Sequence, residues 1–156
     1  MHRPLRSVSL VLALVAASFS FAAAPPDPET MVVVKADDLV WKDYPGLPGV
    51  RFAIVFGDPG KEGPYTIRVK FAPHVMSRPH YHPEARYVTV LKGTWWAGTG
   101  DKFDPNATTP VPAGSAAMHY ARKVHYDGAK DEEVLVQISG VGPSGTIPVQ
   151  PGESPK

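Results

Sequence analysis

The sequence predicts an all-β protein, a sandwich or barrel built from many short strands. Short runs rich in Val, Tyr, Phe and Thr alternate with turn residues at a spacing of about 8–12 residues, which is typical of these folds. The chain of 156 residues contains 18 Pro and 14 Gly, a content that favours frequent turns. After the N-terminal segment, no helical apolar period persists beyond two turns, so long amphipathic helices are not expected.

The chain begins with the features of a secretory signal peptide. Basic residues precede an apolar run from Val8 to Phe21, and small residues follow it. The run is shorter than the ~20 residues that a membrane-spanning helix needs. We expect cleavage after Ala22, so that residues 1–22 form the signal peptide and residues 23–30 a Pro-rich flexible leader. The mature protein is then expected to be secreted or periplasmic and free of the membrane, and an uncleaved membrane anchor is the alternative.

Residues 31–150 are expected to form a single domain of strands. The clearest strand is Tyr65–Phe71, in which every second residue is apolar. Turn signals such as Lys92-Gly93 and Asp127-Gly128 separate the runs. In chain order, the predicted strands cover Met31–Lys35, Asp38–Lys42, Val50–Phe56, Tyr65–Phe71, Arg86–Leu91, Thr94–Ala97, Ser115–Ala121 and Glu132–Ile138.

The composition argues against several function classes. The 16 basic and 15 acidic residues are spread without clusters, so no nucleic-acid partner is expected. The absence of cysteine excludes disulfides, thiolate metal ligands and cysteine nucleophiles. The sequence also lacks a Gly-x-Ser-x-Gly nucleophile elbow and a Gly-Lys-Ser/Thr phosphate-binding loop. Nucleophilic hydrolysis is therefore poorly supported.

The histidines carry the clearest chemical signal. His80 and His82 project from the same face if they lie in a strand, so their imidazoles could share one metal ion. Glu84 has the same parity and could add an oxygen ligand. A third histidine must come from elsewhere, and His119 and His125 are the candidates. An ordinary surface pair is the alternative interpretation of His80 and His82.

Two segments resemble the conserved motifs of the cupin superfamily. Pro79–Pro83, followed by Val88–Gly93, resembles the first motif, which runs His-x-His, three or four residues, Glu, six residues, Gly. The segment from Gly114 to His125 resembles the second motif and places His125 at its histidine position. The resemblance covers about residues 50–145. It implies a small single-domain cupin with a double-stranded β-helix, a jelly-roll barrel of two antiparallel sheets.

The resemblance also implies a divalent metal, held inside the barrel by His80, His82 and His125. The glutamate of the first motif does not carry over, because Arg86 stands four residues after His82 and Tyr87 stands five residues after it. A guanidinium has no acceptor atom and cannot ligate a cation. Three alternatives stay open: Glu84 supplies the carboxylate, the site uses histidines alone, or the metal has been lost. The candidate ions are Zn, Fe, Mn, Cu and Ni.

The candidate contacts for a small-molecule ligand are Arg86, Tyr87, His119 and Trp96. An inward Arg86 would present its N–H donors to a carboxylate or phosphate, whereas a surface pair with Glu84 is the alternative. Trp95 and Trp96 face opposite sides of a strand, so one lines the barrel and the other faces outward, where it would indicate a homodimer face. The sequence leaves open which is which. His119 is a fourth nitrogen ligand, a proton carrier or a core histidine.

These features predict a metal-binding protein that acts on a small organic molecule, as an oxygenase, isomerase or lyase. The alternative is a non-catalytic protein that captures a metal, or a small acidic or aromatic ligand with Arg86 as the anion anchor. A purely structural role has little support in the sequence. One barrel hosts many activities, so enzymatic activity is left open.

Overall fold

The computed structural model describes residues 27–152, and the chain divides into two units, residues 1–33 and 34–156. The predicted signal peptide, residues 1–22, lies outside the described residues, as do residues 23–26 of the predicted leader. Within the described part, no helix is long and apolar enough to cross a membrane.

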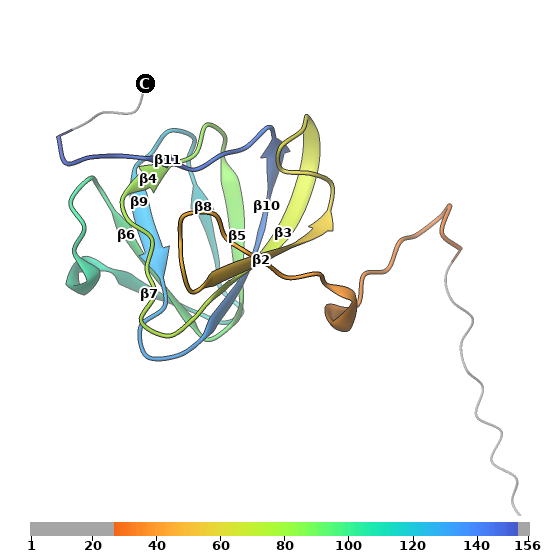
Figure 1. The fold of residues 1–156 in the computed structure, drawn as a ribbon, viewed down its shortest axis with the longest axis horizontal. Coiled ribbons are helices and arrows are strands. Elements are labelled where there is room, and N and C mark those ends of the chain that lie inside the picture. Colours follow the sequence, from red (N-terminus) through yellow and green to blue (C-terminus); the bar gives the residue numbers. More distant parts are fainter. Residues whose placement is uncertain (1–26, 153–156) are drawn as a thin grey trace, which may run out of the picture. The chain divides into compact units, whose positions relative to one another are not determined.

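The second unit is built from two antiparallel sheets, which confirms the predicted all-β class (Figure 1). The strands are β1 (Lys42–Asp43), β2 (Val50–Phe56), β3 (Gly63–Phe71), β4 (His80–Tyr81), β5 (Arg86–Lys92), β6 (Thr94–Thr99), β7 (Thr109–Pro112), β8 (Ala116–His119), β9 (His125–Gly128), β10 (Val134–Gly142) and β11 (Ile147–Pro148). The six-stranded sheet has the order β1-β2-β3-β10-β5-β8, and the five-stranded sheet has the order β11-β4-β9-β6-β7. Of two short 3-10 helices in the described residues, η1 (Ala36–Asp38) precedes β1 and η2 (Pro105–Ala107) lies between β6 and β7.

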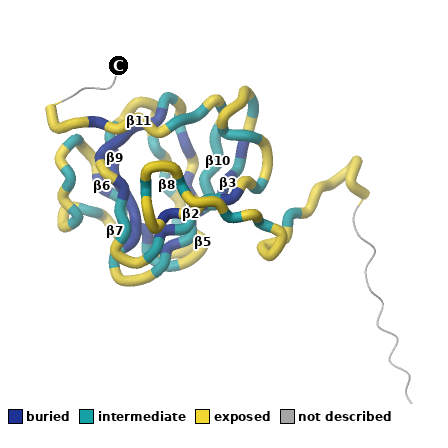
Figure 2. Tube along the Cα trace, viewed as in Figure 1, coloured by how far each residue is buried: buried dark blue, intermediate teal, exposed yellow. Residues whose placement is uncertain are grey.

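The core is formed by apolar side chains that alternate along the strands. On β3, the apolar residues from Tyr65 to Phe71 are between 2% and 5% exposed, and the residues between them are more exposed, as the sequence predicts. The neighbouring strands add buried side chains from both sheets, and Figure 2 shows the buried stretches within the strands and the exposed ones in the connections. These residues are Val50, Val88, Val90, Trp95, Val134 and Val136.

Two predicted strands near the N-terminus are wrong. Residues Met31–Lys35 form no strand, because β-branched residues favour a strand only where a neighbouring strand and a packed face receive them. Most of Asp38–Lys42 is not a strand either, since Asp38 ends η1 and β1 begins only at Lys42. A carboxylate oxygen of Asp38 accepts the backbone N–H of Lys35 at 3.3 Å, a local bond that favours the turn over an extended chain.

Three short strands that the sequence did not predict, β4, β9 and β11, bring distant segments together. β4 pairs antiparallel with β9, and His80 lies directly opposite His125. β11 pairs with the other side of β4, with Ile147 opposite Tyr81. Residues 143–146, which connect β10 to β11, therefore run beside the residues that follow β4, where Nδ1 of His82 donates to the carbonyl oxygen of Gly145.

Candidate metal centre

Three histidine rings face one another where β4 meets β9. The ring centroids of His80 and His125 are 4.5 Å apart, those of His80 and His82 are 4.9 Å apart, and those of His82 and His125 are 5.0 Å apart. One nitrogen of each ring lies within 4.8 Å of the other two. All three residues are buried. The structure thus brings together the three histidines that the resemblance implies as metal ligands.

Backbone carbonyl groups fix the tautomer of all three rings. In each ring Nδ1 donates a hydrogen bond to a carbonyl oxygen, which can only accept. Each Nδ1 therefore carries the proton, and each Nε2 keeps its lone pair. Such partners commonly orient histidines in metal sites. The Nδ1–O distances are 2.7 Å from His80 to Arg78, 2.7 Å from His82 to Gly145 and 2.9 Å from His125 to Lys123.

Burial keeps two of these rings uncharged. Desolvation, followed by the positive charge of Arg86, lowers the pKa of His82 from 6.5 to about 2. Desolvation, followed by the nearby ring of His119, lowers the pKa of His125 to about 4. Near neutral pH both residues therefore offer an unprotonated Nε2, the form of imidazole that binds metals.

The surroundings of Nε2 of His125 indicate that this site suits a cation. Among residues 27–152, it is the one buried side-chain nitrogen or oxygen that has no hydrogen-bond partner. Buried polar atoms nearly always have a partner, because an unsatisfied one is unfavourable. A metal ion would satisfy the lone pair, and imidazole suits several divalent transition metals. The donor set therefore fits such an ion.

Arg86 is buried and lies beside the histidines, at the place where the first motif has glutamate. Its Nη1 donates to Nε2 of His82 at 3.3 Å. Its Nε and Nη2 donate to the hydroxyl oxygen of Ser144 at 3.2 and 2.8 Å. In the described part of the chain, no carboxylate lies within 4.0 Å of the guanidinium. The partners of Arg86 are thus neutral groups, and the predicted surface pair with Glu84 does not form.

Glu84 and Tyr87 lie away from the histidines. Both are exposed, with Tyr87 at 59%, and both line a surface hollow together with residues 139–141 of β10. The Glu84 carboxylate is not part of the group of ligand atoms formed by His80, His82 and His125. The structure does not bring these two sequence-predicted residues to the site, because Glu84 lies in the connection between β4 and β5 and Tyr87 lies on the exposed face of β5.

The two adjacent tryptophans face opposite ways, and Trp95 is the inward one. Trp95 is 1% exposed and lines the cavity that contains the histidines. Trp96, the predicted ligand contact, is partly buried on the other face, where Nζ of Lys130 lies 3.7 Å from its ring centroid. Trp95 lines the cavity because its side chain lies on the face of β6 that packs into the core. Alternation in the sequence shows that the two tryptophans face opposite ways, but it does not show which of them faces inward.

His119 and Asp127 adjoin the three histidines. The rings of His119 and His125 have centroids 3.6 Å apart, and burial lowers the pKa of His119 below its usual value. Asp127 follows His125 by two residues on β9, and its Oδ2 lies 3.9 Å from Nε2 of His125. Its Oδ1 accepts the indole N–H of Trp95 at 3.3 Å. Asp127 was not predicted from the sequence, although the alternation His125-Tyr126-Asp127 is the signal that could have found it.

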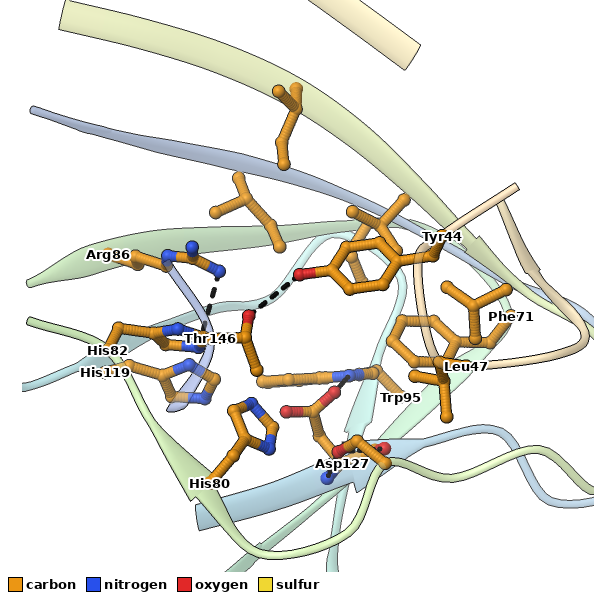
Figure 3. Close-up of a pocket in the computed structure, with 16 residues that line it drawn as sticks. Tyr44, Leu47, Phe71, His80, His82, Arg86, Trp95, His119, Asp127 and Thr146 are labelled. Atoms are coloured by element: carbon orange, nitrogen blue, oxygen red, sulfur yellow. Dashed lines mark hydrogen bonds between the residues drawn. The ribbon is translucent and has the colours of Figure 1, made fainter. Parts of the chain in front are cut away.

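One cavity connects this polar cluster to an apolar wall (Figure 3). Arg86 and the rings of His80, His82 and His119 lie on one side, while Phe71 and Leu47 lie on the other. The hydroxyls of Tyr44 and Thr146 are hydrogen bonded at 2.8 Å beside the cavity and link two segments far apart in the sequence. A cavity that combines a few convergent polar groups with apolar walls is typical of small-molecule sites.

The sequence matches the family described as the ChrR cupin-like domain over residues 29–106, half of the chain. The matched segment contains His80, His82 and Arg86, whereas His125 and Asp127 follow it. No curated protein sequence matches the chain.

Several solved structures share the fold. The polyketide cyclase RemF from Streptomyces resistomycificus has a TM-score of 0.66 and 18% identity, over 80% of this chain and 89% of that chain. Rru_A2000, a cupin-2 domain from Rhodospirillum rubrum, has a TM-score of 0.57 and 19% identity, over 79% of this chain and 81% of that chain. One of the structures described as the DMSP lyases RdDddP and RnDddQII has a TM-score of 0.58 and 12% identity, over 72% of this chain and 63% of that chain. These similarities confirm the predicted double-stranded β-helix.

Proposed function

Because this chain belongs to the ChrR cupin-like domain family, we propose that it binds a divalent transition-metal ion and uses it on a small organic molecule in the barrel. His80, His82 and His125 would hold the ion through Nε2. The ion would supply Lewis-acid or oxygen-activating chemistry when bound. The observation that carries the proposal is the convergence of three Nε2 atoms, one of them buried without a partner.

The other cavity residues indicate the class of molecule. Arg86 can turn its N–H donors toward a carboxylate or phosphate, the groups that its planar fork binds best. The opposite wall, with Phe71 and Leu47, is apolar. Together they favour a small molecule that has an acidic head and an apolar body. The similar structures include a cyclase and lyases, so the fold alone does not select a reaction.

A second candidate function is the capture of such an acidic ligand without catalysis. The observation that favours it is the environment of Arg86, a buried guanidinium whose partners in the described chain are a hydroxyl, a carbonyl and an imidazole. A buried charge without an opposite charge is unfavourable, and an anionic ligand would relieve this. In this function Arg86, and not the histidines, would dominate ligand affinity.

We also propose that the protein is exported. The support is the sequence alone: basic residues, an apolar run and the small residues Ser20 and Ala22 in the order of a signal peptide. N-terminal sequencing of the protein recovered outside the cytoplasm is expected to begin at Ala23. Recovery of the full-length chain only in the cytoplasm, or in the membrane, would exclude this proposal.

Elemental analysis tests the metal-binding proposal directly. After dialysis without chelator, the protein is expected to hold close to one transition-metal ion per chain. The double variant His80→Ala/His82→Ala is expected to hold much less Zn²⁺, because two of the three nitrogen ligands proposed for this position are gone. A protein that takes up no ion when offered Zn²⁺, Fe²⁺, Mn²⁺, Cu²⁺ and Ni²⁺ in turn would overturn the proposal.

The control is His74→Asn, a histidine substitution at an exposed site. His74 has a φ of 65°, a left-handed conformation that Asn tolerates, so the variant should fold normally. Its metal content should equal that of the unchanged protein. If it lost metal as the double variant does, the binding would be nonspecific uptake by surface histidines.

A further inference from the structure

We propose that His119, His125 and Asp127 form a second cation position, adjacent to the three-histidine position and sharing His125 with it. The inference rests on the proposed metal binding and adds an oxygen ligand to it. Nε2 of His125 has a single lone pair, so the two positions are alternative places for one ion. The expected occupant is an ion that accepts mixed nitrogen and oxygen ligands, of the class of Fe²⁺, Mn²⁺ and Co²⁺.

The geometry comes from the alternation of β9. His125 and Asp127 are two residues apart on this strand, so their side chains share one face. One ligand atom each of His119, His125 and Asp127 lies within 4.8 Å of the other two. Figure 3 shows the Asp127 carboxylate between Trp95 and the ring of His80, at the wall of the same cavity. Two imidazoles and one carboxylate are a recurrent ligand set for divalent iron.

The burial of Asp127 calls for a nearby positive charge. The side chains of His125 and Asp127 are only 6% and 9% exposed. In residues 27–152, no Lys or Arg nitrogen lies within 4.0 Å of the Asp127 carboxylate. The indole N–H of Trp95 contacts Oδ1 at 3.3 Å, which leaves Oδ2 facing His125. A buried carboxylate is unfavourable without a counter-charge, and a divalent cation supplies one.

The backbone of Asp127 is held firmly, so the carboxylate is fixed at the cavity wall. Its N–H donates to the Ser77 hydroxyl oxygen at 2.9 Å. The carbonyl oxygen of Asp127 in turn accepts from the Ser77 hydroxyl at 3.0 Å and from the Ser77 backbone N–H at 2.8 Å. Ligands that are oriented before binding lose less entropy when the ion arrives.

The charges around the two positions differ in sign. At the three-histidine position, the Arg86 guanidinium donates to Nε2 of His82 at 3.3 Å, so it both engages a ligand lone pair and repels a cation. At the second position the Asp127 carboxylate is itself a ligand, and the Arg86 guanidinium, whose charge still reaches His119, makes no hydrogen bond to the described His119, His125 or Asp127 side chains. Arg86 stands where the first motif has glutamate, and the carboxylate near the histidines is instead that of Asp127 on β9. Electrostatics therefore favour the second position for an ion that accepts oxygen.

Co²⁺ binding to two variants, of which Asp127→Asn is isosteric, tests this inference. Asp127→Asn retains an oxygen that can accept from Trp95 but removes the charge, and it is expected to weaken Co²⁺ binding at least about tenfold. The visible absorption of bound Co²⁺, which reports its ligands, should change as well. His119→Ala is expected to weaken Co²⁺ similarly. Melting of each metal-free variant checks the fold, and the rise in Tm on adding Co²⁺ should be smaller than in the unchanged protein.

The outcomes separate this inference from the proposed function. If Asp127→Asn and His119→Ala leave Co²⁺ affinity and absorption unchanged while His80→Ala/His82→Ala abolishes binding, the second position is wrong and the three-histidine site stands. If only Asp127→Asn and His119→Ala weaken binding, the second position stands alone. The matched control Glu84→Gln removes an exposed carboxylate and should change nothing. An equal loss in Glu84→Gln would mean that net charge, and not ligation, sets the affinity.

Discussion

The guanidinium of Arg86 donates from Nη1 to Nε2 of His82 at 3.3 Å, so a basic side chain engages the atom that would bind a metal. The tautomer of His82 makes this contact possible, because its Nδ1 donates to Gly145 and leaves Nε2 as an acceptor. An ion that coordinates His82 must therefore break this bond. Metal binding and the position of Arg86 are coupled through this one lone pair.

The first prediction is that Arg86→Met strengthens Zn²⁺ binding at the three-histidine position about tenfold, equivalent to about 1.4 kcal/mol. Methionine fills similar space but removes the charge and the donor to His82. Competition with a fluorescent chelator measures the affinity, and an Asp127→Asn background isolates the three-histidine position. Weaker or unchanged Zn²⁺ binding would contradict the prediction. The titration of His82 followed by NMR gives a second measurement, since removal of Arg86 should raise the pKa of His82.

The second prediction concerns the pH dependence of stability without metal. Unfolded histidines take up protons below a pKa of about 6.5. In the folded protein the pKa of His125 is lowered to about 4 and that of His82 to about 2. The unfolded state therefore binds more protons as the pH falls below 6.5, and the free energy of unfolding must decrease. The contribution of these rings is fully present above pH 6.5 and is lost as the pH falls towards their folded pKa values.

Urea denaturation at pH 7 and pH 5 measures this effect. The unfolding free energy should be lower at pH 5, and His82→Gln should reduce the difference because it removes one of the titrating groups. His74→Asn should retain the difference, since His74 is exposed. Equal unfolding free energies at the two pH values in the unchanged protein would show that the rings are already protonated in the fold or hydrated like free imidazole.

The third prediction compares the two neighbouring tryptophans. Trp95 is 1% exposed within the core, so Trp95→Ala is expected to lower the unfolding free energy by about 3–5 kcal/mol. It also removes the N–H that Asp127 accepts. Trp96 is only partly buried beneath Lys130, so Trp96→Ala should lower the unfolding free energy by about 1 kcal/mol. Denaturant unfolding of the two variants provides the measurement, and equal losses would refute the assignment of Trp95 to the interior.

The parts of the fold that the sequence predicts are those whose signal is local. β2 forms over the predicted Val50–Phe56, and β3 extends the predicted Tyr65–Phe71, because both runs are rich in β-branched and aromatic residues and β3 also alternates. β4 has only 2 residues and β9 has 4, which is too short for a period to be recognised. The run at Met31–Lys35 shows the opposite error: it has strand residues, but no strand forms there.

The residues of the candidate site also differ in how well the sequence predicts them. His80, His82 and His125 could be named because their spacing resembles known motifs, and the structure brings them together. Asp127 was missed although it alternates with His125 on β9, whereas the orientation of Trp95 could not be named because it depends on the pairing of strands that lie far apart in the sequence. Glu84 has the parity of a ligand, yet it is exposed, since parity holds only while the strand continues and β4 ends at Tyr81.

The fourth prediction is that a small carboxylate and the metal bind cooperatively. An anion that engages Arg86 draws the guanidinium away from His82 and frees Nε2, which lowers the free energy of metal binding at the three-histidine position. Linkage then requires that the metal raise the affinity for the anion by the same factor. We choose benzoate as the probe, because its ring suits the apolar wall formed by Phe71 and Leu47.

Calorimetric titration measures both sides of this coupling. Zn²⁺ is titrated into the protein with and without benzoate, and benzoate is titrated into the protein with and without Zn²⁺. We expect each ligand to increase the affinity for the other about fivefold, which is near the lower end of typical coupling between two sites. Arg86→Met should abolish the coupling while Zn²⁺ still binds, because the group that senses both partners is gone. Benzoate that weakens Zn²⁺ binding would instead mean that the anion competes with the protein for the ion. Independent binding would mean that Arg86 keeps its contact with Ser144 and does not respond to the anion.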